Sequence, residues 1–163
     1  MEKATSNSES ELKKYKKGDI LFVEGEFPKN LYIIKTGRVR VFKEKNGKLI
    51  PVISNGPKEF VGELSLFTQS LKRGATGLIT EDTELIEIER KGIQEVIRKC
   101  PEWVNELFKT VAERLRTAGT IIRENYIEDD EKQVGMPLKR DEEEIFVKKI
   151  NEYRIKKSIP IPD

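Results

Sequence analysis

The residues that could do chemistry in this chain gather in one short segment, where Gly62 and Glu63 open a turn and Arg73 follows eleven residues after the glycine. A glycine before a short helical turn leaves backbone N–H groups without partners, and such groups attract an anion that Gly62 would let approach closely. Guanidinium suits a phosphate because its planar fork donates two parallel hydrogen bonds. The Glu63 carboxylate is out of place there unless it accepts hydrogen bonds from hydroxyl groups, such as those of a ribose. The segment therefore predicts a site for a phosphate that carries a sugar.

The composition excludes several other kinds of chemistry. The chain has no histidine, which removes the commonest general base and metal ligand, and with them histidine-dependent triads and zinc sites. The single cysteine, Cys100, precedes a proline, and we interpret it as part of a helix end rather than as a nucleophile. No cluster of acid, base and nucleophile stands outside the binding turn. We therefore expect a protein that is not an enzyme and that holds no metal and no cofactor.

Length and charge indicate one domain with appendages. The 163 residues suffice for one hydrophobic core, and the 37% of charged residues indicates a charged tail beside it. With 31 basic and 29 acidic residues, the net charge of +2 gives no general reason to expect a nucleic acid or a membrane as partner. No apolar run approaches the roughly 18 residues that span a bilayer, the N-terminus does not resemble a signal peptide, and the cysteine usage fits a reducing compartment. We expect a cytoplasmic protein.

Short apolar runs separated by turn residues fill the first half of the chain. They predict an antiparallel sandwich, roll or barrel, and they are Ile20 to Val23, Leu31 to Ile34, Val39 to Phe42, Leu49 to Ile53, Ala75 to Ile79 and Glu84 to Ile88. Asn46-Gly47 between two runs indicates a hairpin, because both residues tolerate positive φ. In the third run two valines alternate with charged residues, which predicts one buried and one solvated face: Val39 and Val41 against Arg38, Arg40 and Lys43.

After Arg90 the apolar period becomes helical, and Pro101 suits the first turn of a long helix over 102–125. Its apolar residues are spaced by four and three in turn, as in a heptad seam: Val104, Phe108, Val111, Leu115, Ala118 and Ile122. Such a seam favours a homodimer, although the stripe could instead cover the β-roll.

The chain thus divides into three parts: a flexible N-terminal arm over 1–13, a β-roll with its long helix over 14–125, and a charged linker with a short amphipathic tail over 126–163. Charges dominate residues 128 to 144, and Gly135 and Pro137 interrupt any helix there. Apolar residues such as Phe146 and Tyr153 then make a short amphipathic helix possible.

The segment from Phe60 to Thr76 resembles the phosphate-binding cassette of the cyclic-nucleotide-binding domain, the β-roll found in catabolite activator protein, cyclic-nucleotide-dependent kinases and nucleotide-gated channels. In that family a Gly-Glu-Leu turn and a later Arg, followed by a small residue, Ala and often Thr, enclose the cyclic phosphate. Here the matching segments are Gly62-Glu63-Leu64 and Arg73-Gly74-Ala75-Thr76. The early strands are also similar, for example at Glu24-Gly25-Glu26 and Leu31-Tyr32-Ile33-Ile34.

The resemblance implies that Glu63 binds the ribose 2′-hydroxyl and Arg73 the phosphate, with backbone groups assisting. The implied ligand-binding set is Gly62, Glu63, Leu64, Ser65, Arg73, Gly74, Ala75 and Thr76. Two features depart from catabolite activator protein. Gly74 replaces a hydroxyl residue after the phosphate Arg, and Ala118 and Gly119 replace the Thr and Ser that its long helix offers to the purine. Thr117 and Thr120 are the candidates to contact the base instead.

The resemblance thus predicts a ligand-sensing regulatory module that binds a cyclic mononucleotide, cAMP first and cGMP second, and relays it through the C-terminal helix. Residues 126–163 are too few, and too acidic at their start, for a winged DNA-binding module, so we do not expect DNA as a partner unless the chain is a fragment of a catabolite-activator-like transcription regulator.

Two alternatives stay open. A β-roll with an empty cassette could act as a protein-interaction scaffold through its tail around Phe146 and Tyr153, with Glu63 and Arg73 paired to each other. A cyclic dinucleotide could also occupy the site.

Overall fold

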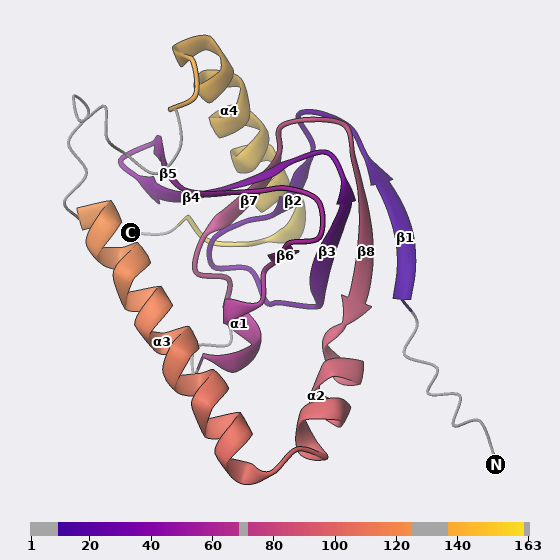
Figure 1. Cartoon of the computed structure of the whole chain (residues 1–163). Coiled ribbons are helices and arrows are strands. Elements are labelled where there is room, and N and C mark those ends of the chain that lie inside the picture. Colours follow the sequence, from indigo (N-terminus) through magenta and orange to yellow (C-terminus); the bar gives the residue numbers. More distant parts are fainter. Residues whose placement is uncertain (1–9, 69–71, 125–136, 162–163) are drawn as a thin grey trace.

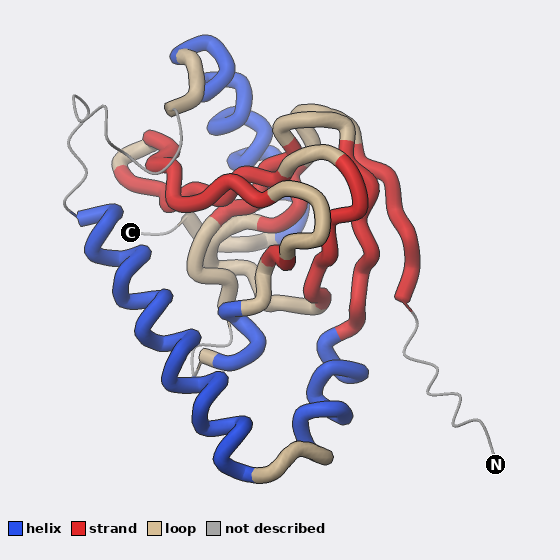
Figure 2. The backbone as a smooth tube through the Cα atoms, viewed as in Figure 1, coloured by secondary structure: helices blue, strands red, loops and turns tan. Residues whose placement is uncertain are grey.

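The computed structural model describes residues 10–68, 72–124 and 137–161, without the side chains of residues 122 and 123. Within these ranges the strands form two four-stranded antiparallel sheets, in the orders β1-β8-β3-β6 and β2-β7-β4-β5. The strands are β1 (Ser10–Tyr15), β2 (Ile20–Phe22), β3 (Asn30–Thr36), β4 (Val39–Lys45), β5 (Lys48–Asn55), β6 (Phe60–Val61), β7 (Thr76–Ile79) and β8 (Thr83–Glu89). Figure 2 shows the strands gathered in one roll with the helices outside it.

The predicted β-roll is confirmed, and each of the six apolar runs overlaps a strand. Side chains from both sheets pack between them to form the core, as the period-two pattern requires: Leu21, Phe22, Tyr32, Ile34, Val39, Val61, Ile79 and Leu85. The predicted hairpin joins β4 to β5, where Asn46 and Gly47 have φ of 52° and 74°. These positive values match the type of turn that fits the twist of paired strands.

Strand β1 corrects the predicted N-terminal arm, because residues 10–13 belong to this strand and only residues 1–9 lie outside the described part of the chain. β1 pairs along its whole length with β8, from Ser10 opposite Ile88 to Tyr15 opposite Thr83. It is an edge strand held by backbone hydrogen bonds and by an ion pair of 3.2 Å between Lys13 and Glu87. Such a strand needs little apolar surface, which is why its composition resembles that of an arm.

Four helices surround the roll in the described residues: α1 (Leu64–Phe67), α2 (Arg90–Arg98), α3 (Glu102–Glu124) and α4 (Arg140–Lys157). In Figure 1, α3 runs along one side of the roll and α1 lies between them. The rings of Phe67 in α1 and Phe108 in α3 stack with their centres 4.9 Å apart, which fixes α3 beside the cassette. None of the described helices is both long and apolar enough to cross a bilayer.

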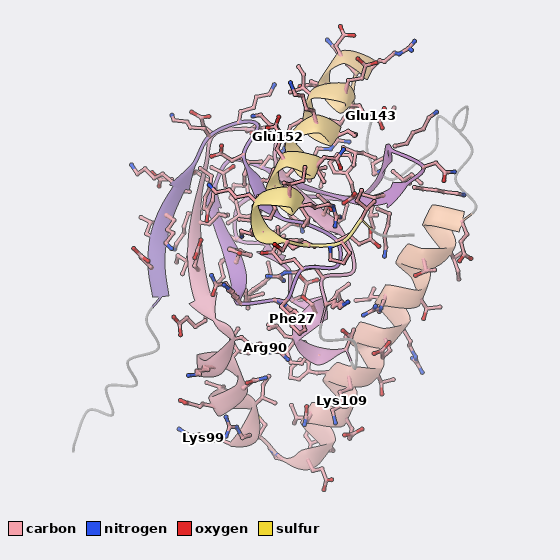
Figure 3. The ribbon with its side chains drawn as sticks, turned by 180° about the vertical axis from the view of Figure 1, so that it is seen from behind. Phe27, Arg90, Lys99, Lys109, Glu143 and Glu152 are labelled. Atoms are coloured by element: carbon pink, nitrogen blue, oxygen red, sulfur yellow. The ribbon has the colours of Figure 1, made fainter. Side chains whose placement is uncertain are left out.

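Helix α4 begins at Arg140, inside the segment that we expected to be a linker. Its first turn carries Asp141, Glu142 and Glu143, and acidic residues there favour a helix through its dipole. Figure 3, seen from behind, shows α4 lying across the roll, with Glu143 near its start and Glu152 farther along. Apolar residues of α4 and of the second sheet form a second core: Val23, Phe42, Leu49, Leu78, Phe146 and Ile150.

Candidate functional site

The cassette, the β4–β5 hairpin and α3 enclose a cavity of about 730 Å³, counted out to its open mouth. Seven of the eight predicted ligand-binding residues line it: Gly62, Glu63, Leu64, Ser65, Arg73, Gly74 and Ala75. The opposite wall is mainly apolar and comes from the sheet and from α3, through Phe22, Val41, Val52, Ile53 and Leu115. A polar end and an apolar wall are what a ligand with a charged group and a flat ring requires.

The Arg73 side chain is 3% exposed and is held entirely by neutral groups. Its Nη1 donates to the Gly62 carbonyl at 2.7 Å and to Ser65 Oγ at 2.9 Å, while Nη2 donates to the Asn30 carbonyl at 2.5 Å. The guanidinium carbon lies 4.3 Å from the centre of the Phe22 ring. These contacts fix the direction of the guanidinium beside the cavity without neutralising its charge.

Nε of Arg73 is also buried, and it makes no hydrogen bond with the described residues. Among the ion pairs of the described residues, none brings a carboxylate to Arg73. Burial lowers the pKa of Arg73, and the Tyr32 side chain and the Glu26 carboxylate oppose that change. A buried charge without a counter-ion is costly, so an anion that enters the cavity gains strongly from this side chain.

Both the backbone conformation of Gly62 and its contact with Arg73 favour glycine at this position. Its φ is +85°, a conformation that side chains disfavour, and a Cβ built on it would lie 2.3 Å from Nη1 of Arg73. The sequence predicted that Gly62 makes room for a phosphate, and the structure shows that the neighbour it makes room for is the guanidinium. Helix α1, with four residues, contributes little dipole compared with a full helix.

Glu63 lines the same cavity but does not pair with Arg73 among the described residues. The structural ion pair of the scaffold alternative is therefore not formed. Burial is the largest influence on Glu63 and raises its pKa, while a hydrogen bond from its own backbone N–H and the charge of Arg73 oppose the rise. A half-buried carboxylate of this kind is ready to accept hydrogen bonds from ligand hydroxyl groups.

Three predicted residues point elsewhere. Thr76 is fully buried outside the cavity, where its hydroxyl accepts from the Glu24 N–H at 2.8 Å and donates to the Glu44 carboxylate. Thr117 and Thr120 do not line the cavity, because each hydroxyl donates to the carbonyl one turn earlier in α3. The contacts of these threonines with the base stay a prediction. The α3 residues at the cavity are Leu115, Arg116 and Gly119.

Sequence reasoning missed three cations of the cavity wall, Lys43, Lys72 and Arg116. Lys43 was grouped with Arg38 and Arg40 on a solvated face, yet it is 7% exposed and lines the cavity. The sequence does indicate the position of Lys43, because alternate residues of a strand lie on one face and Lys43 therefore shares a face with Val39 and Val41. Arg116 lines the cavity from α3 and donates to Thr68 Oγ1 at 3.4 Å.

Comparisons with known proteins show the family of the chain. The family model for the cyclic nucleotide-binding domain matches residues 12–100. The chain is 33% identical over 105 residues to a cyclic AMP receptor protein of Thermus thermophilus, a match that covers 64% of this chain and 48% of that protein. It is 30% identical over 103 residues to a CRP-like cAMP-activated global transcriptional regulator of Mycobacterium tuberculosis, covering 63% and 46%. The matched segment thus spans about half the length of these two relatives.

A solved structure with a similar fold is that of the EAL enzyme Bd1971 in its cAMP-bound form. The TM-score is 0.62 at 27% identity, over 69% of this chain and 30% of that one. The likeness therefore concerns one part of a larger protein.

Proposed function

This chain belongs to the cyclic nucleotide-binding domain family, and from that premise we propose that it is a ligand-sensing regulatory module for a cyclic mononucleotide, with cAMP as the first candidate and cGMP as the second. The names of the relatives support cAMP, since one is a cyclic AMP receptor and another a cAMP-activated regulator. cGMP shares the ribose and the cyclic phosphate, so the polar end of the cavity suits it equally.

The observation that carries the proposal is the buried guanidinium of Arg73, whose hydrogen-bond partners among the described residues are all neutral and whose Nε has none there. A cyclic phosphate supplies the missing negative charge and an acceptor for Nε. The Glu63 carboxylate in the same cavity is placed to accept from the ribose hydroxyl, and the apolar wall is placed to receive the base. One small ligand thus explains each of these features.

We propose that α3 relays binding and that it joins two copies of the chain. Leu115, Arg116 and Gly119 of α3 form part of the cavity wall, so a ligand there contacts the helix directly. Large apolar side chains of the seam stay open to solvent in the single chain, at 43% for Phe108, 44% for Val111 and 51% for Leu115. Ala112 is instead buried, at 3% exposure. The seam is therefore largely unpartnered within one chain, which supports a homodimer.

We further propose that the chain acts by binding rather than by catalysis, and that it works in the cytoplasm. The charged residues at the cavity are Lys43, Glu63, Lys72, Arg73 and Arg116, a set suited to holding an anionic ligand.

The scaffold alternative loses support from the position of the tail. Phe146 is 4% exposed and belongs to the second core, so it is not available to bind a partner. The Tyr153 hydroxyl is likewise engaged, at 3.2 Å from the Glu26 carboxylate.

Thermal unfolding with a panel of nucleotides tests the proposal. The panel contains cAMP, cGMP, linear 5′-AMP and a cyclic dinucleotide. We expect cAMP or cGMP, at a concentration 100-fold above its dissociation constant, to stabilise the protein by about 2.7 kcal/mol, and 5′-AMP to act far more weakly. Stabilisation by no cyclic mononucleotide, or by the cyclic dinucleotide alone, would contradict the proposal.

A further inference from the structure

The cavity wall holds a buried lysine whose contact with the ligand the proposed function leaves unspecified. Nζ of Lys43, in β4, lies 3.4 Å from Oε1 of Glu24, and the two side chains are 9% and 10% exposed. A buried ion pair is a weak stabiliser by itself, because removing two charges from water offsets their attraction. Lys43 lines the cavity and Glu24 does not. The carboxylate therefore stands behind the ammonium and positions it at the cavity wall.

Glu24 is itself held in place. Its Oε2 accepts the backbone N–H of Glu44 at 3.2 Å, and its own N–H donates to Thr76 Oγ1 at 2.8 Å. The ion pair is thus anchored to neighbouring strand segments, and its cation lines the cavity.

Two glycines border this lysine. A Cβ built on Gly74 would lie 3.9 Å from Nζ of Lys43, and one built on Gly119 would lie 3.8 Å from its Cε. These are the positions at which the resemblance to catabolite activator protein led us to expect hydroxyl side chains. Gly74 directly follows Arg73 in the cassette. The Lys43 ammonium is therefore in contact with the place where the absent hydroxyl side chain would begin.

We propose that Lys43 is a second cationic contact for the phosphate of the ligand and takes the place of the hydroxyl group that Gly74 lacks. The inference rests on the proposed function, because it concerns the same cavity. The contacts of Arg73 support it: Nη1 already donates to two protein oxygens and Nη2 to one, so the guanidinium has few donors left for the ligand. The three donors of an ammonium can be shared between Glu24 and a phosphate.

Titration calorimetry with cAMP and with cGMP tests the role of Lys43. The proteins compared are the wild type, Lys43→Met, and Lys35→Met, a matched control on the exposed face of β3. We expect Lys43→Met to weaken both nucleotides by at least about tenfold and by equal factors, because the cyclic phosphate is what the two ligands share. Lys35→Met should bind as the wild type does.

A rescue variant makes the assignment specific. Gly74→Ser fits sterically, since among the described residues only Lys43 lies within 4 Å of the new Cβ and the φ of Gly74 is not positive. In the Lys43→Met background, Gly74→Ser should recover most of the lost affinity by restoring a hydroxyl donor.

The outcomes separate the two claims. If the wild type binds and Lys43→Met binds equally well, the role of Lys43 is overturned while the proposed function stands. A loss confined to one nucleotide would place the contact at the base and overturn it as well. If the wild type binds neither nucleotide, the proposed function falls and this inference falls with it.

Discussion

Replacing Gly62 by alanine tests the packing of the Arg73 guanidinium against the cassette turn, and Gly25→Ala provides its control. Both glycines have nearly the same φ, +85° and +86°. A Cβ on Gly62 would meet Nη1 of Arg73 at 2.3 Å, whereas a Cβ on Gly25 would meet no atom of the described residues within 4 Å. The difference between the two variants therefore isolates the crowding of the guanidinium from the backbone strain.

The magnitudes follow from these contacts. A side chain at positive φ costs about 1–3 kcal/mol, and both variants carry this term. In Gly62→Ala the guanidinium must also move, which breaks the hydrogen bonds of Nη1 to Gly62 O and Ser65 Oγ. Each hydrogen bond from a charged donor contributes about 1.5–3 kcal/mol. We expect Gly62→Ala to lower the unfolding free energy by at least about 1.5 kcal/mol more than Gly25→Ala, because at least one of these hydrogen bonds is lost.

Urea unfolding without ligand measures both values, and the Arg73→Met background completes a double-mutant cycle. Without the guanidinium there is nothing to crowd, so Gly62→Ala should then cost no more than Gly25→Ala. Equal losses for the two alanine variants in the wild-type background would refute the argument that Gly62 makes room for Arg73.

Three further predictions concern the rest of the molecule. Arg154 is 2% exposed and its Nη2 lies 2.7 Å from Glu44 Oε1, so Arg154→Met should lower the unfolding free energy in urea by about 3–5 kcal/mol, because the Glu44 carboxylate loses its counter-ion. Arg140→Met removes an exposed ion pair and should change the unfolding free energy by less than about 1 kcal/mol. Similar losses for the two variants would contradict the role of the buried pair. Because burial raises the pKa of Glu63 above its ordinary 4.5, the folded state binds that proton more tightly, and its contribution to stability falls as the pH rises from about 4.5 through the folded-state pKa. Glu63→Gln should therefore stabilise the ligand-free protein at pH 7 and change little at pH 3.5, while weakening nucleotide binding, and an equal effect at both pH values would speak against burial as the cause. Val111→Glu should convert a dimer to a monomer in light scattering, and an unchanged mass would remove α3 as the interface.

Much of the architecture follows from local patterns. The turn at Asn46 and the change of period after Arg90 each depend on neighbouring residues, and each matches an element of the structure. The solvated face predicted for β4 is wrong, because Phe42 on that face is fully buried in the core shared with α4. The cassette was also predictable, because its glycine, carboxylate and guanidinium lie close together in the chain and their order is specific.

The features that sequence reasoning missed depend on distant contacts. β1 is held by backbone pairing with β8, which leaves no apolar pattern, and the docking of α4 depends on an open face of the second sheet. Thr76 points away from the cavity because it bridges Glu24 and Glu44. Lys43 was missed because its positive charge suggested a solvated face. It lies two residues after Val41 in the strand, and this spacing places both side chains on the cavity side.

The central claim is that the buried Arg73 guanidinium holds the phosphate of a cyclic nucleotide. Its most direct test is the dissociation constant for cAMP, measured by calorimetry on the wild type, on Arg73→Met and on Arg98→Met, a variant of an exposed arginine in α2. Arg98→Met should bind as the wild type does, and Arg73→Met, while still folded by circular dichroism, should bind at least about tenfold more weakly. Equal affinity of a folded Arg73→Met variant would contradict the claim.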